Sequence, residues 1–327
     1  MKILVTGSSG HLGEAMVRVL RASGHATVGV DLLPSPFTDS VGSIADRTFV
    51  ARCCRGVDAI VHTATLHKPH VVTHSCQQFV DTNVTGTLNL LEEAVEASVD
   101  AFVFTSTTSV FGRALTAEPK GGVPWLTEET VPLPKNIYGV TKLSAENLCE
   151  LFHRRHRLPC LILRTSRFFP EEDDSPELRA AYGDANLKAN EFLNRRVELQ
   201  DAADAHVLAL QKAPSIGFGR YIISATTPFR LEDCLELGQS VPNVVARYIP
   251  QCEPEYERRG WRMFPTLDRI YVNSLARTDL GWCPKYDFAF VVEQLGRGED
   301  PRSELARQVG SKRYHAEEFD HGPYPVE

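Results

Sequence analysis

The pattern of apolar and polar positions predicts a strand, a turn, a helix and a second strand at the start of the chain. The apolar run of residues 2–6 leads directly into the glycine-rich stretch 7–13. A helix follows, because apolar residues recur at helical spacing until Ser23 and Gly24 end it. These recurring positions are Leu12, Ala15, Met16, Val19 and Leu20. Residues 26–30 predict the second strand, which finishes on Asp31.

Strand-like and helix-like patterns continue to alternate as far as residue 164. The predicted elements are residues 57–61, 77–97, 101–105, 138–155 and 159–164. Strands that alternate with helices form parallel sheets with helices on both faces. The sequence therefore predicts an α/β fold built on a Rossmann-type, doubly wound parallel sheet.

The turn between the first strand and helix carries glycines at positions 7, 10 and 13. Glycines let the backbone approach a pyrophosphate, and the helix start offers unpaired N–H groups, so this turn predicts a dinucleotide site. The alternative is an ordinary strand–turn–helix connection. Asp31 is expected to bind the adenosine ribose hydroxyls. A carboxylate there would repel a 2′-phosphate, and residues 32–34 include no arginine, so NAD is predicted rather than NADP.

Tyr138 and Lys142 lie four residues apart, so a phenol and an ammonium share one helix face. An adjacent cation favours the phenolate, and we expect Lys142 to lower the pKa of Tyr138 from its usual value of about 10. Such a phenol takes a proton from an alcohol or gives one to a carbonyl. The pair predicts acid–base chemistry, although this spacing also occurs in ordinary exposed helices.

Taken together, these motifs resemble the extended short-chain dehydrogenase/reductases, the group that contains NAD-dependent epimerases and dehydratases. Three further segments resemble the group in the same order. Residues 58–65 are similar to its fourth strand, residues 82–87 to its Asn-x-x-Gly-Thr helix, and residues 104–112 to its Ser-rich strand end. The resemblance is strong over about the first 165 residues and patchy afterwards.

The resemblance implies a catalytic set and a cofactor site. Thr107 would orient the substrate oxygen, with Ser106 and Thr108 as alternatives for that position. Tyr138 would exchange the substrate proton, and Lys142 would bind the nicotinamide ribose and keep Tyr138 ionised. The residues expected at the cofactor are Gly7, Ser9, Gly10, His11, Leu12, Gly13, Asp31, Ser43, Ile44, His62, Ala64, Asn83, Thr105, Tyr138 and Lys142.

The resemblance also implies how the chain is divided. An NAD-binding Rossmann domain is expected over residues 1–165, and residues 201–225 are expected to return to it. Residues 166–200 and 226–327 would form the substrate-binding region, a smaller C-terminal α/β domain.

Several reactions are compatible with this resemblance. It implies hydride transfer between NAD and a secondary hydroxyl or carbonyl of a sugar or nucleotide sugar, as in an epimerase. Dehydration is not expected, because Thr108 and Ser109 stand where the family's sugar dehydratases carry an Asp-Glu pair. The short stretch between Arg164 and Asp201 favours an alternative, a dehydrogenase of a small free sugar, sugar acid or polyol. A non-catalytic dinucleotide-binding regulator is a further alternative.

Substrate contacts are expected from two regions. Arg195, Arg196 and Arg220 lie where relatives bind a diphosphate, and arginine suits that geometry, although solvated surface arginines are the alternative. The loop of residues 65–74 is expected to overhang the nicotinamide. The expected substrate-binding residues are His67, Lys68, Thr107, Thr108, Arg196 and Arg220. No metal is predicted from His67, His70 and His74, because no carboxylate-rich cluster accompanies them.

Composition narrows the setting. The formal charge of -7 and pI near 5.9 argue against nucleic acid as a partner. No apolar run approaches the roughly 18 residues that a membrane span needs, so a cytoplasmic protein with no membrane partner is expected. The eight cysteines include no Cys-x-x-Cys pair and are interpreted as small hydrophobic residues. A homodimer is expected, because helices equivalent to 83–97 and 138–155 commonly pair in proteins that the chain resembles.

Overall fold

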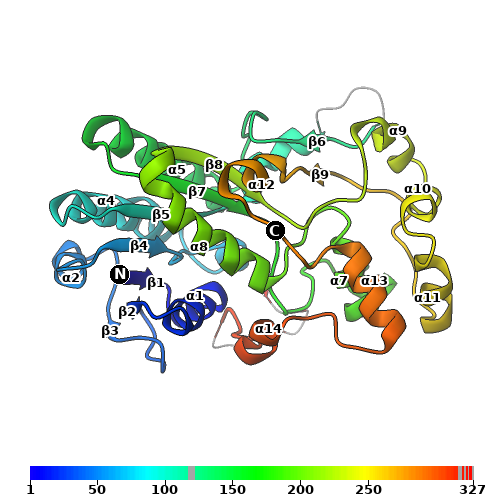
Figure 1. The fold of residues 1–327 in the computed structure, drawn as a ribbon, viewed down its shortest axis with the longest axis horizontal. Coiled ribbons are helices and arrows are strands. Elements are labelled where there is room, and N and C mark those ends of the chain that lie inside the picture. The colour runs from blue at the N-terminus through cyan, green and yellow to red at the C-terminus, as the bar shows by residue number, and fades with distance from the viewer. Residues whose placement is uncertain (117–121, 316–318, 320–321, 323, 326–327) are drawn as a thin grey trace.

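The computed structural model describes residues 1–116, 122–315, 319, 322, 324 and 325. Within these residues the central sheet has seven strands, and every pair is parallel (Figure 1). Across the sheet the order is β3 (Ser40–Val41), β2 (Ala26–Asp31), β1 (Lys2–Thr6), β4 (Ala59–His62), β5 (Ala101–Thr107), β7 (Cys160–Thr165) and β8 (Phe218–Ile223). The direction of the order reverses between β1 and β4, which is the switch point where doubly wound folds bind ligands. The predicted Rossmann-type α/β fold is confirmed.

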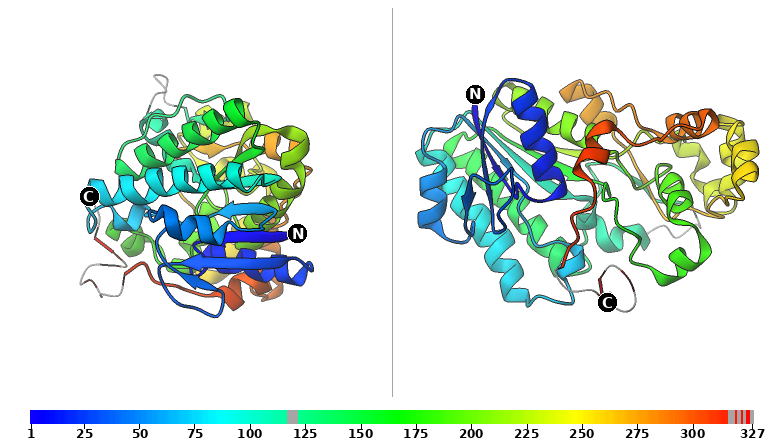
Figure 2. Two further views of the ribbon diagram at one scale, coloured as in Figure 1. Left: turned by 90° about the vertical axis from the view of Figure 1, so that its left-hand side faces the viewer. Right: turned by 90° about the horizontal axis from the view of Figure 1, so that it is seen from below.

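Helices cover both faces of this sheet (Figures 1 and 2). One face carries α1 (His11–Ala22), α8 (Leu199–Ile216), α12 (Ser274–Leu280) and α14 (Glu304–Val309). The other carries α2 (Arg47–Cys53), α4 (Gly86–Glu96) and α5 (Ile137–His156). Strand side chains alternate between the faces: Val103 packs toward α8, whereas Phe102 and Phe104 pack toward α4 and α5. Both faces are buried, which explains the continuous apolar runs in the sequence.

A second hydrophobic core lies beside the sheet, at the right of Figure 1, and draws mainly on residues 187–193 and 225–295. Its helices are α6 (Pro176–Ala181), α7 (Asp184–Glu191), α9 (Cys234–Leu237), α10 (Val241–Tyr248), α11 (Cys252–Arg259) and α13 (Phe288–Arg297). Strands β6 (Trp125–Leu126) and β9 (Ile270–Tyr271) pair in parallel near it. Within the stretch 226–327, which was expected to bind substrate, α12 and α14 instead pack on the sheet.

Asp201, in the first turn of α8, ties the chain after α12 to the sheet. Its carboxylate accepts the backbone N–H groups of Lys285 at 3.0 Å and Tyr286 at 2.9 Å. Its carbonyl accepts the indole N–H of Trp282, a fully buried side chain, at 3.0 Å. Burial raises the pKa of Asp201 to about 7 although these donors oppose the shift. This contact places the C-terminal segments against the Rossmann sheet.

The segment predicted as a single helix over 77–97 contains a change of helix type. It consists of α3 (Cys76–Phe79), a π-helix (Val80–Thr85) and then α4. π turns inside helices often occur at functional sites, and this one carries Asn83, a residue expected at the cofactor. 3₁₀ turns cover Lys68–His70, Leu231–Asp233 and, interrupted at Gly112, Thr108–Thr116. In the part of the chain that the structure describes, no helix combines the length and apolar character needed to span a membrane.

The glycine turn allows α1 to lie very close to the end of β1. A Cβ atom at position 13 would stand 1.8 Å from the carbonyl oxygen of Gly7. Gly7 itself has a φ of +72°, a left-handed conformation that favours glycine, and a Cβ there would stand 2.8 Å from the backbone nitrogen of Ala64. A side chain at position 13 would push α1 away from the end of β1, and one at position 7 would collide with the loop after β4.

We expect Gly13→Ala to destabilise the protein by about 1–3 kcal/mol and to weaken NAD binding, because the clash is with backbone that has little room to move. Gly183→Ala is the control, since a Cβ there meets no atom within 4 Å. Urea unfolding and NAD titration of both variants test this. Equal stability and affinity in the two variants would contradict the packing argument.

Candidate active site

A cavity of about 420 Å³ lies where β1, β4, β5 and β7 end, within the size range of cofactor sites. Many residues expected at the site line it. They are Gly7, Ser9, Gly10, His11, Leu12, Gly13, Asp31, Ser43, Ile44, Ala64, His67, Lys68, Thr105, Thr107, Thr108 and Tyr138. The expected residues that do not line it are His62, Asn83, Lys142, Arg196 and Arg220.

The glycine turn and Asp31 form one half of the cavity. Gly10 precedes α1 in extended conformation, and no side chain caps the helix, so its first N–H groups are open to an anion. Asp31 accepts the backbone N–H of Ser9 and of Leu33, each at 3.0 Å, which fixes its carboxylate at the end of β2. The close backbone at Gly7 and Gly13 leaves room along the turn. These residues fit the pyrophosphate and ribose of a dinucleotide.

His62 lies beneath the cofactor half instead of lining it, contrary to expectation. Its ring is 1% exposed, and its two nitrogens lie 2.8 Å from Thr6 Oγ1 and 2.9 Å from Thr87 Oγ1. Burial, and secondarily the charge of Lys142, lowers the pKa of His62 well below its usual value, so the ring is neutral. Thr6 Oγ1 in turn accepts the backbone N–H of Ala64 at 3.1 Å. His62 therefore orders the loop that lines the cavity.

Asn83 has a similar indirect position. Its Oδ1 accepts the backbone N–H of Leu66 at 2.8 Å and the hydroxyl of Thr65 at 3.0 Å. Its Nδ2 donates to the carbonyl of Leu66 at 2.8 Å and to Thr141 Oγ1 at 3.0 Å. Asn83 thus joins the loop after β4 to α5, and it reaches the cavity only through that loop.

Tyr138 and Thr107 meet inside the cavity through a hydrogen bond between their side chains. Burial raises the pKa of Tyr138 to about 12, and the hydrogen bond from Thr107 opposes the shift. The expectation that Lys142 lowers this pKa is wrong for the structure, because burial dominates. The phenol is protonated here, and a negative charge on it needs further stabilisation from groups that enter the site.

Lys142 lies below the cavity floor. Its ammonium donates to the backbone carbonyl of Thr105 at 2.6 Å and lies 4.0 Å from the centre of the Phe104 ring. Burial lowers the pKa of Lys142 to about 7, while Glu146 raises it. The lysine side chain is only 2% exposed, and this burial disfavours its protonated, charged form.

A buried ion pair supports this end of α5. Glu146, one turn after Lys142, accepts Arg164 Nη2 at 2.7 Å and the hydroxyl of Ser106 at 2.5 Å. Glu146 is fully buried and Arg164 is 2% exposed. The pair links α5, β5 and β7, and it engages the hydroxyl of Ser106, which is also a lining residue of the cavity.

His206 in α8 supports Thr105 from the other side of the sheet. Its Nδ1 lies 2.7 Å from the carbonyl of Ala202, and burial lowers its pKa to about 4, so Nδ1 donates and the ring is neutral. Its Nε2 therefore accepts the hydroxyl of Thr105 at 2.8 Å. Both the side chain and the backbone carbonyl of Thr105 are thus committed to buried partners.

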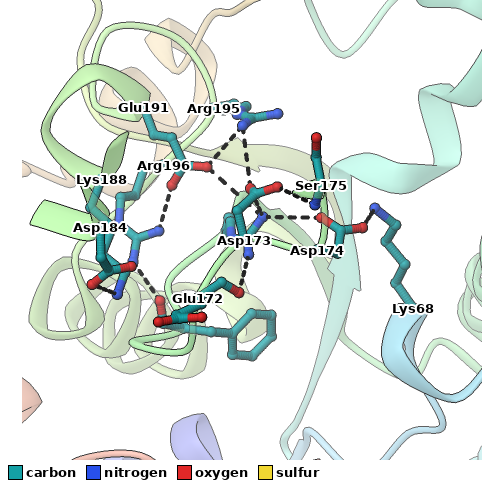
Figure 3. Close-up of polar contacts among 12 residues, drawn as sticks. Lys68, Glu172, Asp173, Asp174, Ser175, Asp184, Lys188, Glu191, Arg195 and Arg196 are labelled. Carbon is teal, nitrogen blue, oxygen red and sulfur yellow. Dashed lines mark hydrogen bonds and ion pairs between the residues drawn. The ribbon is translucent and has the colours of Figure 1, made fainter. Parts of the chain in front are cut away.

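One part of the cavity lining is cationic. Arg167, Arg195, Arg269 and Tyr271 line it, and acidic side chains partly neutralise them. Arg195 pairs with Glu191 at 3.0 Å and Asp173 at 3.5 Å, as Figure 3 shows. Arg167 pairs with Asp173 at 2.6 Å. Three guanidinium groups in the lining of one cavity can bind a diphosphate or another polyanion.

Arg196 and Arg220 lie elsewhere, contrary to the expectation that they bind substrate. Arg196 is buried and pairs with Glu191 at 2.7 Å, on the far side of that carboxylate from Arg195 (Figure 3). Arg220 comes from the middle of β8 and pairs with Glu150 of α5 at 2.7 Å. A strand position away from the carboxyl end cannot reach the cavity, which explains the error for Arg220.

The histidine-rich loop gathers around the cavity rim. His67 and Lys68 line the cavity, and Lys68 pairs with Asp174 (Figure 3). The ring of His70 lies 5.0 Å from that of His74 and 5.1 Å from that of His315. No group of His, Cys, Asp and Glu among the described residues has the arrangement of a metal site.

Comparisons with known proteins identify the family. The model of the NAD dependent epimerase/dehydratase family matches residues 3–222. The chain belongs to this family. It is therefore an NAD-dependent enzyme of the extended short-chain dehydrogenase/reductase type, and the predicted resemblance is confirmed.

Individual relatives cover most of the chain. A low-salt glycan biosynthesis protein of Haloferax volcanii is 31% identical, over 88% of this chain and 95% of its own. A UDP-glucose 4-epimerase of Lactobacillus helveticus is 27% identical, over 88% and 93%. Another relative, an uncharacterized UDP-glucose epimerase of Bacillus subtilis, is 32% identical over 55% of its length. Among solved structures, a UDP-glucose 4-epimerase of Thermotoga maritima has a TM-score of 0.61 at 22% identity, over 91% of this chain and 99% of that one, which supports the fold.

Several lining residues were not expected from the sequence. They are Thr82, Arg167, Phe168, Phe169, Arg269, Tyr271, Lys312, Arg313, Tyr314 and Tyr324. Arg167 follows β7 directly, so its place at a strand end was a usable signal. Arg269 and the C-terminal residues follow no strand of the main sheet, and their approach depends on tertiary packing.

The pKa of Lys142 predicts how stability depends on pH. The unfolded chain keeps this proton up to about pH 10.5, whereas the folded protein releases it near pH 7. The free energy of unfolding of NAD-free protein should therefore gain roughly 1 kcal/mol per pH unit from this residue between pH 7 and 10. Lys142→Met should remove that gain and be the more stable protein at pH 7. Urea unfolding at several pH values measures both, and parallel pH profiles would refute the assignment.

Proposed function

We propose that the protein is an NAD-dependent epimerase of a nucleoside-diphosphate sugar, acting at a secondary hydroxyl. The observation that carries this proposal is one cavity whose lining includes Tyr138, Thr107, the glycine turn and, at what we name the arginine end, Arg167, Arg195 and Arg269. Such a cavity suits a dinucleotide beside a sugar that carries a diphosphate. The curated UDP-glucose 4-epimerase relative supports the same substrate class.

Each residue has a defined task in this proposal. The start of α1 binds the cofactor's pyrophosphate, and Asp31 binds a ribose. The cofactor would supply a reversible hydride acceptor beside the sugar carbon. Tyr138 takes the hydroxyl proton, and Thr107 orients the oxygen. Lys142 alone does not lower the pKa of Tyr138 in the structure, so in this proposal the bound cofactor and substrate, together with the Lys142 ammonium one turn along α5, stabilise the phenolate that takes the proton.

The arginine end favours a nucleotide sugar over a small free sugar or polyol. These arginines already pair with acidic side chains, but Nε of Arg195 and Nε of Arg269 are buried without a hydrogen-bond partner among the described residues, which suits an anionic substrate better than a neutral polyol. The chain also spans 93% and 95% of two curated relatives, so its substrate region is of similar size to theirs. The short stretch between Arg164 and Asp201 is therefore weaker support for a dehydrogenase of a small free sugar, sugar acid or polyol.

We also propose that the enzyme works in the cytoplasm as a homodimer. Val140, in the predicted 138–155 helix, is 47% exposed, and Val80, in the π-helix turn just before the predicted 83–97 helix, is 37% exposed. An isologous contact through these helices would cover both residues.

The nucleotide content of the purified protein tests the reaction type. An epimerase regenerates its cofactor in each cycle, so near-stoichiometric NAD is expected after denaturation and chromatography. Epimerisation of UDP-sugars completes the test. An empty protein that binds NAD reversibly and reduces it with free sugars would favour the dehydrogenase, and NAD binding without turnover of any sugar would favour the regulator.

Tyr138→Phe should lower turnover by about 10²- to 10⁴-fold, because it removes the proton-transferring oxygen. The NAD content and melting temperature should stay close to those of the wild type, since the ring still packs. Epimerase assays with matched nucleotide analysis measure both. Unchanged turnover would remove Tyr138 from the mechanism.

Arg195→Gln should raise KM for a UDP-sugar at least about tenfold, because it removes a charge-assisted contact to the diphosphate. Arg247→Gln is the control, since that exposed residue of α10 pairs with Glu236 of α9, outside the cavity. Steady-state kinetics on both variants decide the matter. An equal rise in KM in both, or in neither, would argue against a diphosphate at the arginine end.

A further inference from the structure

Residues 311–315, which we name the C-terminal strap, cross the cofactor half of the cavity. Figure 2 shows the chain leaving α14 and running past α1 toward the loop that follows β4. Lys312, Arg313 and Tyr314 line the cavity together with Gly10, His11, Leu12 and Gly13 of the glycine turn. The strap is therefore an outer wall of the place where the cofactor's pyrophosphate is expected.

Glu171 anchors the strap to the start of α1. Its Oε1 lies 2.8 Å from His11 Nε2 and accepts the hydroxyl of Ser311 at 2.7 Å and the backbone N–H of Lys312 at 3.0 Å. Burial would raise the pKa of Glu171, but the hydrogen bonds from His11 and Ser311 outweigh it and lower the pKa to about 2. The anchor therefore stays ionised at neutral pH. The ammonium of Lys312 also pairs with Glu14 in the first turn of α1.

The loop after β4 holds the other end of the strap. His70 Nε2 lies 3.2 Å from the carbonyl of Tyr314, and His315 Nε2 lies 2.9 Å from the carbonyl of Pro69. A carbonyl only accepts, so both histidines donate. The ring of Tyr314 packs edge-on against His67, with ring centres 4.9 Å apart. The strap thus bridges two loops that flank the cofactor half of the cavity.

We propose that the C-terminal strap is part of the NAD site and retains the cofactor between turnovers. Lys312 and Arg313 add positive charge opposite the start of α1, and the strap must detach from Glu171 and His70 before NAD can leave. This inference rests on the proposed function, because an epimerase recovers the hydride from its own cofactor and gains nothing from exchange. A dehydrogenase would need an open path at each turnover.

The release rate of NADH tests the strap without any sugar. Protein loaded with NADH is mixed with excess NAD, and the loss of energy transfer from tryptophan to NADH is followed by stopped flow. A variant that ends at Gly310 should release NADH roughly 100-fold faster than the full chain, because the polar contacts of the strap with Glu171, Glu14 and the loop after β4 are lost. Equal release rates would overturn the proposal.

Point variants guard against a folding defect in the shortened chain. Glu171→Gln removes the charge of the anchor and should speed release about tenfold, whereas Glu177→Gln, on the exposed start of α6, should leave it unchanged. Thermal unfolding of each variant shows that it is folded. A release rate that responds equally to both substitutions, or to neither, would refute the anchor.

Failure of the strap and failure of the proposed function give different results. Slow NADH release that the strap controls, with no turnover of any UDP-sugar, would retain the strap and reject the epimerase. Epimerisation of a UDP-sugar, with the same NADH release rate in the full chain and the shortened variant, would retain the epimerase and reject the strap.

Discussion

The close approach of α1 to the end of β1 is the constraint on which the other features depend. Gly13 stands against the carbonyl of Gly7, and Gly7 stands against Ala64 in the loop after β4. This contact sets where the first N–H groups of α1 point, and so where an anion can bind. It also fixes the position of His11 and Glu14, to which the C-terminal strap attaches. The position of α1 thus determines both the cofactor site and the attachment of the C-terminal strap.

The catalytic end of the cavity relies on charges that burial opposes. Lys142, Glu146 and Arg164 are almost inaccessible, and each one lies in contact with the helix or strands that carry Tyr138 and Thr107. Burial alone would discharge the lysine, and Glu146 counteracts it. The packing therefore keeps the pKa of Lys142 near 7 at a cost in stability, as expected for a buried ionisable group in an active site.

Much of the fold and half of the site could be predicted from residues close together in sequence. Local spacing was enough for the sheet, for Gly7 to Asp31 and for the Tyr138 helix, because each signal lies within one strand–turn–helix unit. Arg220 was misplaced because a basic residue near the right strand says nothing about which end of the strand it occupies. His62 and Asn83 lie behind the cavity lining instead of in it, and they act through the loop after β4. The strap could not be foreseen, since Lys312 meets Glu14 across 298 positions.

The anchor of Lys142 has a consequence for mutational tolerance. Its ammonium binds the main-chain oxygen of Thr105, which every amino acid would supply at that position. The side chain of Thr105, by contrast, serves His206. Substitutions at position 105 therefore separate two roles of one residue: they alter the support from α8 while the lysine's acceptor is retained. The acceptor of the lysine's hydrogen bond is thus a backbone atom, so it does not depend on which amino acid stands at position 105.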